Sequence, residues 1–106
     1  MIRILVIDDH PLFRLGLTSV LKAYPDFEVV GEASNAVEGM AVAAKLQPDV
    51  VTMDIYMRGG DGFEGTAKFR ERFPNVKILI VSMSNSIDGE KIARRYKDSA
   101  LQGRKE

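Results

Sequence analysis

A short apolar run that ends at a lone carboxylate constrains the fold of this chain most strongly. Residues Val50–Met53 show no alternation of polar and apolar side chains, which is typical of a strand buried on both faces. Asp54 follows at once, and the Gly-rich segment Arg58–Gly62 comes soon after it. Open α/β sheets carry their functional side chains at the carboxyl edge of the strands. The run therefore predicts a central parallel strand that places Asp54 at that edge.

Apolar runs and segments with helical spacing alternate along the rest of the chain. We expect further buried strands at Ile2–Ile7, Phe27–Ala33 and Val76–Val81. The connections are short, which favours right-handed βα units over any other arrangement. The pattern predicts a doubly wound parallel sheet with helices on both faces.

Three helices are expected between these strands, each with one face turned toward the sheet. The first begins at Pro11, the second is capped by Ser34 or Asn35, and the third begins near Gly62. Gly65 lies inside the third helix at a cost of roughly 1 kcal/mol relative to Ala, which indicates a close contact there. The expected inward residues are Phe13, Leu17, Val20, Leu21 and Tyr24 in the first helix, Val37, Met40, Ala41 and Ala44 in the second, and Phe63, Thr66, Phe69 and Phe73 in the third.

Length and composition exclude several classes of protein. With 106 residues the chain is expected to be a single domain over residues 1–106, with no output domain of its own. Lys plus Arg and Asp plus Glu both number 15, so no overall charge favours nucleic acid or a membrane surface. Cysteine is absent, which excludes disulfides and thiolate metal sites. The amino-terminal residues resemble neither a signal peptide nor a membrane span, so we expect a soluble cytoplasmic protein.

Polar side chains come directly after three of the expected strands. Asp8 and Asp9 follow the first strand, Asp54 the third and Ser82 the fourth. Carboxylates about 4 Å apart repel by roughly 4 kcal/mol at an effective dielectric near 20, so such a cluster requires a proton or a cation. Oxygen ligands at an exposed edge favour Mg²⁺. The chemistry that follows is phosphoryl transfer onto an aspartate, with Ser82 donating to a phosphoryl oxygen.

Taken singly, each of these residues has a simpler interpretation. Asp8 and Asp9 could stabilise a helix N-terminus, and Asp54 could cap a loop. His10 is expected to be a solvent-facing cap and not a metal ligand. The functional interpretation therefore depends on the whole set of side chains.

Several ordered motifs resemble the receiver domain of two-component response regulators over about residues 1–85. They are Val6-Ile7-Asp8-Asp9-His10-Pro11, Pro48-Asp49-Val50-Val51-Thr52-Met53-Asp54, Met57 with Asp61-Gly62, and Phe73 through Ser84. The Asp-Asp-His-Pro opening and the stretch Phe27–Ala33 resemble the branch fused to LuxR-type helix-turn-helix outputs.

The resemblance implies a flavodoxin-like, CheY-like fold and assigns roles to individual residues. Asp54 is similar to the phosphoacceptor that takes a phosphoryl group from a histidine kinase. Asp9 resembles the direct Mg²⁺ ligand, with Asp8 assisting through water and Tyr56 offering its backbone carbonyl. Ser82 matches the residue that hydrogen-bonds the phosphoryl group. Such a domain switches a transcriptional output, contacts DNA only through a separate output domain, and is no enzyme beyond its own phosphorylation and dephosphorylation.

The chain departs from the family pattern in two places. Arg58 stands where the family usually has Pro. After Ser84 the pattern of a fifth strand and fifth helix is missing, and the position of the family's Lys falls near Arg104 or Lys105, which leaves that role unassigned. We expect residues 86 to about 102 to form a helix that pairs two copies into a homodimer; its contact residues would be Ile92, Tyr96, Ala100 and Leu101.

Two classes of function remain open from the sequence. One is a phosphorylatable receiver, and the other is a degenerate or truncated receiver that acts as a non-phosphorylated dimerisation or interaction module. A haloacid-dehalogenase-like hydrolase is disfavoured because Tyr56 stands where its second Asp is needed. A dinucleotide-binding enzyme is disfavoured because no G-x-G-x-x-G follows the first strand.

Overall fold

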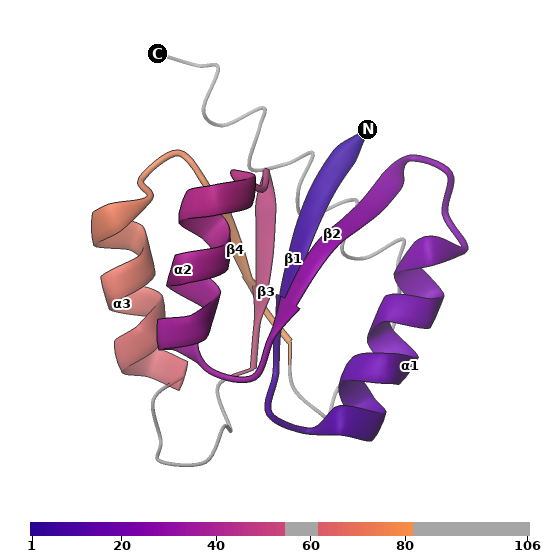
Figure 1. The fold of residues 1–106 in the computed structure, drawn as a ribbon, viewed down its shortest axis with the longest axis horizontal. Coiled ribbons are helices and arrows are strands. Elements are labelled where there is room, and N and C mark those ends of the chain that lie inside the picture. The colour runs from indigo at the N-terminus through magenta and orange to yellow at the C-terminus, as the bar shows by residue number, and fades with distance from the viewer. Residues whose placement is uncertain (55–61, 82–106) are drawn as a thin grey trace.

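The computed structural model describes residues 1–54 and 62–81 (Figure 1). The expectations for Tyr56, Ser82, Arg104, Lys105 and the tail helix with its dimer contact therefore lie outside the described residues. No helix within the described ranges is both long and apolar enough to cross a membrane.

Four parallel strands form one sheet in the order β2-β1-β3-β4. The parallel pairs β1·β2, β1·β3 and β3·β4 hold it together, as expected for βα units. In chain order the elements are β1 (Ile2–Ile7), α1 (Pro11–Lys22), β2 (Phe27–Ala33), α2 (Ala36–Leu46), β3 (Val50–Met53), α3 (Gly62–Arg72) and β4 (Lys77–Ile80).

Helices cover both faces of this sheet (Figure 1). Helix α1 lies on one face, where Leu17 and Leu21 pack with buried residues of the strands. Helices α2 and α3 lie on the other face, where Ala43 and Phe69 complete a second apolar cluster. The expected doubly wound parallel sheet is confirmed for the described strands.

The central strands β1 and β3 are buried on both faces, as their apolar runs predict. Ile4 through Val6 and Val50–Val51 have no exposed surface at all. Strand β4 differs from the expectation of a buried strand, because only Leu79 is buried and its other residues are half-buried. The cause is its position as the last strand of the described sheet.

Helix α2 corrects the expected inward face. Its buried residues are Ala36, Gly39 and Ala43, whereas Val37 is 73% exposed. The sheet and α3 come too close for large side chains: a Cβ on Gly39 would lie 2.3 Å from Ile7 Cδ1. The helix therefore turns small residues toward the closest approach, while the expected inward residue Met40 is half-buried and packs against the second apolar cluster. Ala41 and Ala44, also expected inward, are exposed.

The helix ends follow the expected capping rules with small differences. Asn35, and not Ser34, caps α2, because its Oδ1 accepts a hydrogen bond of 2.8 Å from the Glu38 N–H. Helix α1 ends at Lys22, so Tyr24 lies beyond it, although its ring still packs on the core and lies 5.7 Å from the Phe27 ring. Gly65 meets the close contact that its position indicated, since a Cβ there would lie 2.6 Å from Ala36 Cβ.

A one-residue irregularity interrupts the pairing of β1 with β2. Ile4 pairs with Val29, but Leu5 pairs with Gly31, so Val30 is an extra residue. Because side chains alternate along a strand, the extra residue exchanges the two faces for the rest of β2. Ala33 consequently joins the cluster under α2 and α3, and Glu32 points to the face that α1 covers.

Candidate functional site

Backbone hydrogen bonds bring the ends of three neighbouring strands into line. The Asp8 N–H donates to the Ala33 carbonyl at 3.0 Å, and the Asp54 N–H donates to the Ile7 carbonyl at 3.2 Å. The sheet ladder thus continues one residue beyond β1 and β3. Asp8 and Asp54 lie side by side at the carboxyl edge because that ladder fixes them there.

The turn from β1 into α1 adds a third carboxylate and an imidazole to this edge. His10 is the N-cap residue of α1, with extended backbone angles, and Pro11 begins the helix. The His10 backbone N–H donates to Asp8 Oδ1 at 2.7 Å, and this hydrogen bond stabilises the turn. The His10 side chain itself makes no capping hydrogen bond to the helix. Asp9 lies between these two residues and belongs to the same cluster.

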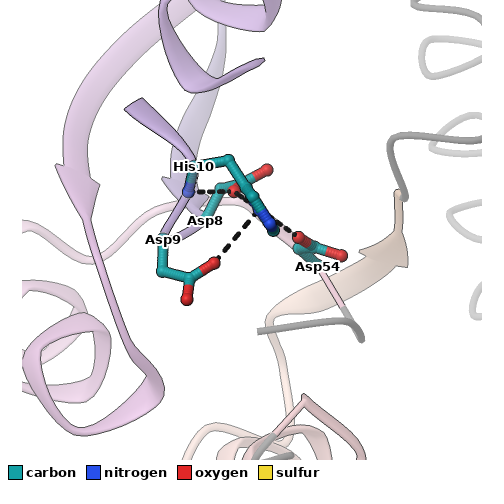
Figure 2. A group of neighbouring side chains, drawn as sticks. All are labelled: Asp8, Asp9, His10 and Asp54. Atoms are coloured by element: carbon teal, nitrogen blue, oxygen red, sulfur yellow. Dashed lines mark hydrogen bonds and ion pairs between the residues drawn. The ribbon is translucent and has the colours of Figure 1, made fainter. Parts of the chain in front are cut away.

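The His10 ring points into the carboxylates (Figure 2). Its Nδ1 lies 2.9 Å from Asp8 Oδ1, 3.1 Å from Asp9 Oδ1 and 3.1 Å from Asp54 Oδ2. The expectation that His10 is a cap is confirmed, but the expectation that its side chain faces solvent is wrong. Three negative groups attract the ring, and its side chain keeps only 34% of its surface exposed.

Burial makes the electrostatics of this cluster unusual. Asp8 is 1% exposed and Asp54 is 2% exposed. Burial raises the pKa of Asp8 above the ordinary aspartate value, although the hydrogen bonds from His10 act against this rise. The hydrogen bond to Asp8 raises the pKa of His10 above its ordinary value. Each group therefore favours a proton that reduces the net negative charge of the site.

The same arrangement fits a divalent cation held by oxygen atoms. The ligand atoms of Asp8, Asp9, His10 and Asp54 all lie within 4.8 Å of one another. Asp8 Oδ2 is buried and has no hydrogen-bond partner among residues 1–54 and 62–81. Carboxylate oxygens are the donors that Mg²⁺ prefers, and it binds through one or two of them with water in its other positions. A cation here would share these oxygens with the His10 ring, so the two compete.

The structure thus gathers Asp8, Asp9 and Asp54, as their positions after neighbouring strands predict. Ser82 and Tyr56 belong to the residues outside the description. The orientation of His10 differs from the one expected from the sequence. Its position next to two acids was a usable signal, since a titratable base beside a carboxylate cluster acquires a partner.

A cavity of about 460 Å³ lies elsewhere, at the ends of α2 and α3 and the start of β4. Gln47, Phe73 and Lys77 are among its lining residues. None of the clustered acids lines it, so it is separate from the candidate site.

Comparison with known proteins decides the family. The sequence pattern of the family described as the response regulator receiver domain matches residues 4–99. The chain belongs to this family. The fold described above is the fold of such domains, and the receiver domain is of the type found in LuxR-family and NarL-type regulators.

Curated relatives of this receiver domain include several transcriptional regulators. The transcriptional regulatory protein LiaR of Bacillus subtilis is 45% identical over 92 residues, which are 87% of this chain and 43% of that protein. The nitrate/nitrite response regulator protein NarL of Escherichia coli is 43% identical over 82 residues, or 77% of this chain and 38% of that protein. The chain thus spans less than half the length of these relatives.

Solved structures agree with the fold. The receiver domain of CheB from Thermotoga maritima has a TM-score of 0.72 and 34% identity, covering 91% of this chain and 72% of that chain. The signal receiver domain of NarL from Mycobacterium tuberculosis has a TM-score of 0.70 and 33% identity, covering 80% of this chain and 68% of that chain.

One relative differs from the transcriptional regulators in its named activity. The protein-glutamate methylesterase/protein-glutamine glutaminase 2 of Methanospirillum hungatei is 43% identical over 88 residues, but these are only 25% of that protein. Receiver domains are thus similar in proteins with different outputs. The receiver sequence alone does not identify the output.

Proposed function

We propose that residues 1–106 are a phosphoacceptor receiver domain that takes a phosphoryl group from a histidine kinase onto Asp54 and thereby switches a transcriptional output. One observation carries this proposal: three carboxylates from two strand ends lie around a single atom, His10 Nδ1. Buried acids in mutual contact destabilise a fold, so a purely structural role accounts poorly for them.

In the proposed reaction, an Asp54 carboxylate oxygen attacks the phosphorus of a phosphohistidine. The new oxygen–phosphorus bond forms as the phosphorus–nitrogen bond breaks, and the imidazole of the kinase leaves and takes up a proton. The residues that would hold Mg²⁺ are Asp8, Asp9 and Asp54. When bound, this ion neutralises charge on the oxygens around the transferred group.

The chain's own residues prepare Asp54 for this role. The backbone bond from its N–H to the Ile7 carbonyl fixes where the carboxylate stands relative to Asp8. Burial keeps water from competing for the nucleophilic oxygens, and the His10 ring balances their charge while no other cation is present. The roles of Ser82 and of the Tyr56 carbonyl remain proposals taken from the family resemblance.

The kinase partner, the contact with DNA through an output domain and the cytoplasmic location follow from the same proposal. The names of LiaR and NarL as regulatory proteins support a transcriptional output. Homodimerisation through the tail and the absence of further enzymatic activity are also retained as proposals.

A beryllofluoride titration in MgCl₂ tests the proposed function. RcsB from Salmonella enterica has been solved with this phosphomimetic. Binding is monitored through the NMR signal of the imidazole of the single histidine. We expect saturable binding of beryllofluoride to the wild type and no binding to Asp54→Ala. A wild type that binds no beryllofluoride at saturating MgCl₂ contradicts the proposal and favours the non-phosphorylated interaction module. Binding that requires neither Mg²⁺ nor Asp54 also contradicts the proposal.

A further inference from the structure

Arg14 connects the turn that carries the acids to the neighbouring strand β2. One guanidinium nitrogen, Nη1, donates to the backbone carbonyl of Asp8. Another, Nε, lies 3.2 Å from Glu32 Oε1. A single side chain therefore holds the end of β1 and the end of β2 at the same time.

The position of Arg14 in its helix is unusual for a basic residue. It lies in the first turn of α1, where its N–H donates to the His10 carbonyl at 2.9 Å. Helix N-termini favour acidic side chains, and the first turn of α1 has none. The guanidinium instead reaches back past the helix end to the Asp8 carbonyl.

The pairing irregularity in β2 is what makes this bridge possible. With regular alternation from Phe27, which packs under α1, Glu32 would point to the face covered by α2. The extra residue Val30 reverses the alternation, so Glu32 meets Arg14 instead. The bridge thus joins α1, which follows the Asp-Asp-His-Pro opening, to the stretch Phe27–Ala33, the two features that resemble the LuxR-type branch.

Stability alone accounts poorly for such a bridge. The Arg14 side chain is 23% exposed and that of Glu32 is 45% exposed. Ion pairs so close to solvent contribute little to folding. The contact of Arg14 with the Asp8 carbonyl matters for another reason. Asp8 carries one of the clustered carboxylates, and the next residue, Asp9, carries another.

We propose that Arg14 is a positioning residue for the divalent-cation site: by tying the Asp8 carbonyl to Glu32, it fixes the turn that presents the Asp8 and Asp9 carboxylates. This role rests on the proposed function, since it assumes that the acids bind Mg²⁺. Residues that orient metal ligands from outside typically change metal affinity by about 10- to 100-fold when they are removed.

The test measures MgCl₂ affinity directly, by calorimetry, in the wild type, Arg14→Ala, Glu32→Ala and the double variant. We expect Arg14→Ala to weaken Mg²⁺ binding about tenfold. Glu32→Ala should weaken it less, and the double variant should be no worse than Arg14→Ala, because both changes break one bridge. Lys68→Ala is the matched control, since it removes an exposed cation that lies 3.3 Å from Glu64 on α3, and it should change nothing.

A second readout separates positioning from a general loss of structure. With acetyl phosphate as donor, Arg14→Ala should need more Mg²⁺ for half-maximal labelling, while the rate at saturating Mg²⁺ stays close to that of the wild type. If Arg14→Ala does not fold, Arg14→Lys and Glu32→Gln carry the same test, with smaller expected shifts.

The failures are distinguishable. A wild type that binds Mg²⁺, with Arg14→Ala binding it equally well, overturns only the role of Arg14. If Lys68→Ala weakens Mg²⁺ binding as much as Arg14→Ala does, the role of Arg14 is also overturned, because loss of any positive charge then explains the change. A wild type that binds no Mg²⁺ overturns the proposed function, and the role of Arg14 with it.

Discussion

His10 Nδ1 lies 3.1 Å from Asp54 Oδ2, so the start of α1 supplies a base to the acid at the end of β3. The same nitrogen contacts Asp8 and Asp9. The cluster of three carboxylates therefore has a counter-charge within the chain itself whenever the ring is protonated. A metal ion that binds these oxygens has to displace this interaction.

The first prediction concerns the protonation of His10. Its pKa in the folded domain is raised, chiefly by the hydrogen bond to Asp8. A raised folded pKa stabilises the fold fully below the unfolded pKa of about 6.5, and this stabilisation is lost as the pH rises through the folded value. We expect the metal-free domain to lose stability in urea across that neutral window, and His10→Ala to lose less. Because the pKa of Asp8 is also raised in the folded domain, its titration likewise makes the fold less stable as the pH rises, in a more acidic range.

NMR measures this directly, because the chain has a single histidine. The imidazole signal should titrate above the ordinary value without metal, and MgCl₂ should lower its midpoint by competition for the same oxygens. A midpoint at or below the ordinary histidine value, unchanged by Mg²⁺, contradicts the geometry.

The second prediction concerns the metal ligands. The dissociation constant of the wild type for Mg²⁺ should lie in the millimolar to sub-millimolar range, as expected for a site with few protein ligands. Asp9→Ala removes one of the three carboxylates, and we expect it to abolish Mg²⁺ binding. Calorimetry checks this. Glu64→Ala is the control, since it removes an exposed acid of α3 that does not belong to the cluster. Normal Mg²⁺ affinity in Asp9→Ala argues against the assignment.

The third prediction concerns the contact between α2 and α3. Gly65→Ala gains about 1 kcal/mol of helix propensity, but its new Cβ would lie 2.6 Å from Ala36 Cβ, which is fixed to the backbone. Overpacking of this kind costs typically about 1–3 kcal/mol, so we expect net destabilisation of roughly 1 kcal/mol in urea unfolding.

The double variant Ala36→Gly/Gly65→Ala is the control, because it moves the methyl group from one helix to the other. It should recover most of the loss. If Gly65→Ala is more stable than the wild type, the two helices are farther apart than the structure places them.

Much of this fold was predictable because burial and strand order leave few alternatives. Runs such as Ile4–Ile7 and Val50–Met53 identify central strands, and an acid directly after such a strand lies at the carboxyl edge by geometry. The convergence of Asp8, Asp9 and Asp54 was therefore within reach of the sequence.

Other features depend on distances that a sequence does not contain. The expected inward face of α2 is wrong at Val37, Ala41 and Ala44, which are exposed, although Met40 does pack against the core. The close approach of Gly39 to Ile7 sets the buried face, and a sequence does not contain that distance. The orientation of His10 depends on Asp54 at the end of β3 as well as on the adjacent Asp8 and Asp9. The bridge between Arg14 and Glu32 depends on one extra residue in β2. Gly31 directly after Val29-Val30 is a usable signal of such an irregularity, but it does not indicate which side chain Glu32 meets.

Intact-protein mass spectrometry after incubation with acetyl phosphate and MgCl₂ tests most directly whether Asp54 is the phosphoacceptor. We expect a mass increase of one phosphoryl group in the wild type, none in Asp54→Asn, and a modified peptide that contains Asp54. Labelling that persists in Asp54→Asn, or a wild type that remains unlabelled at saturating Mg²⁺, would contradict this role of Asp54.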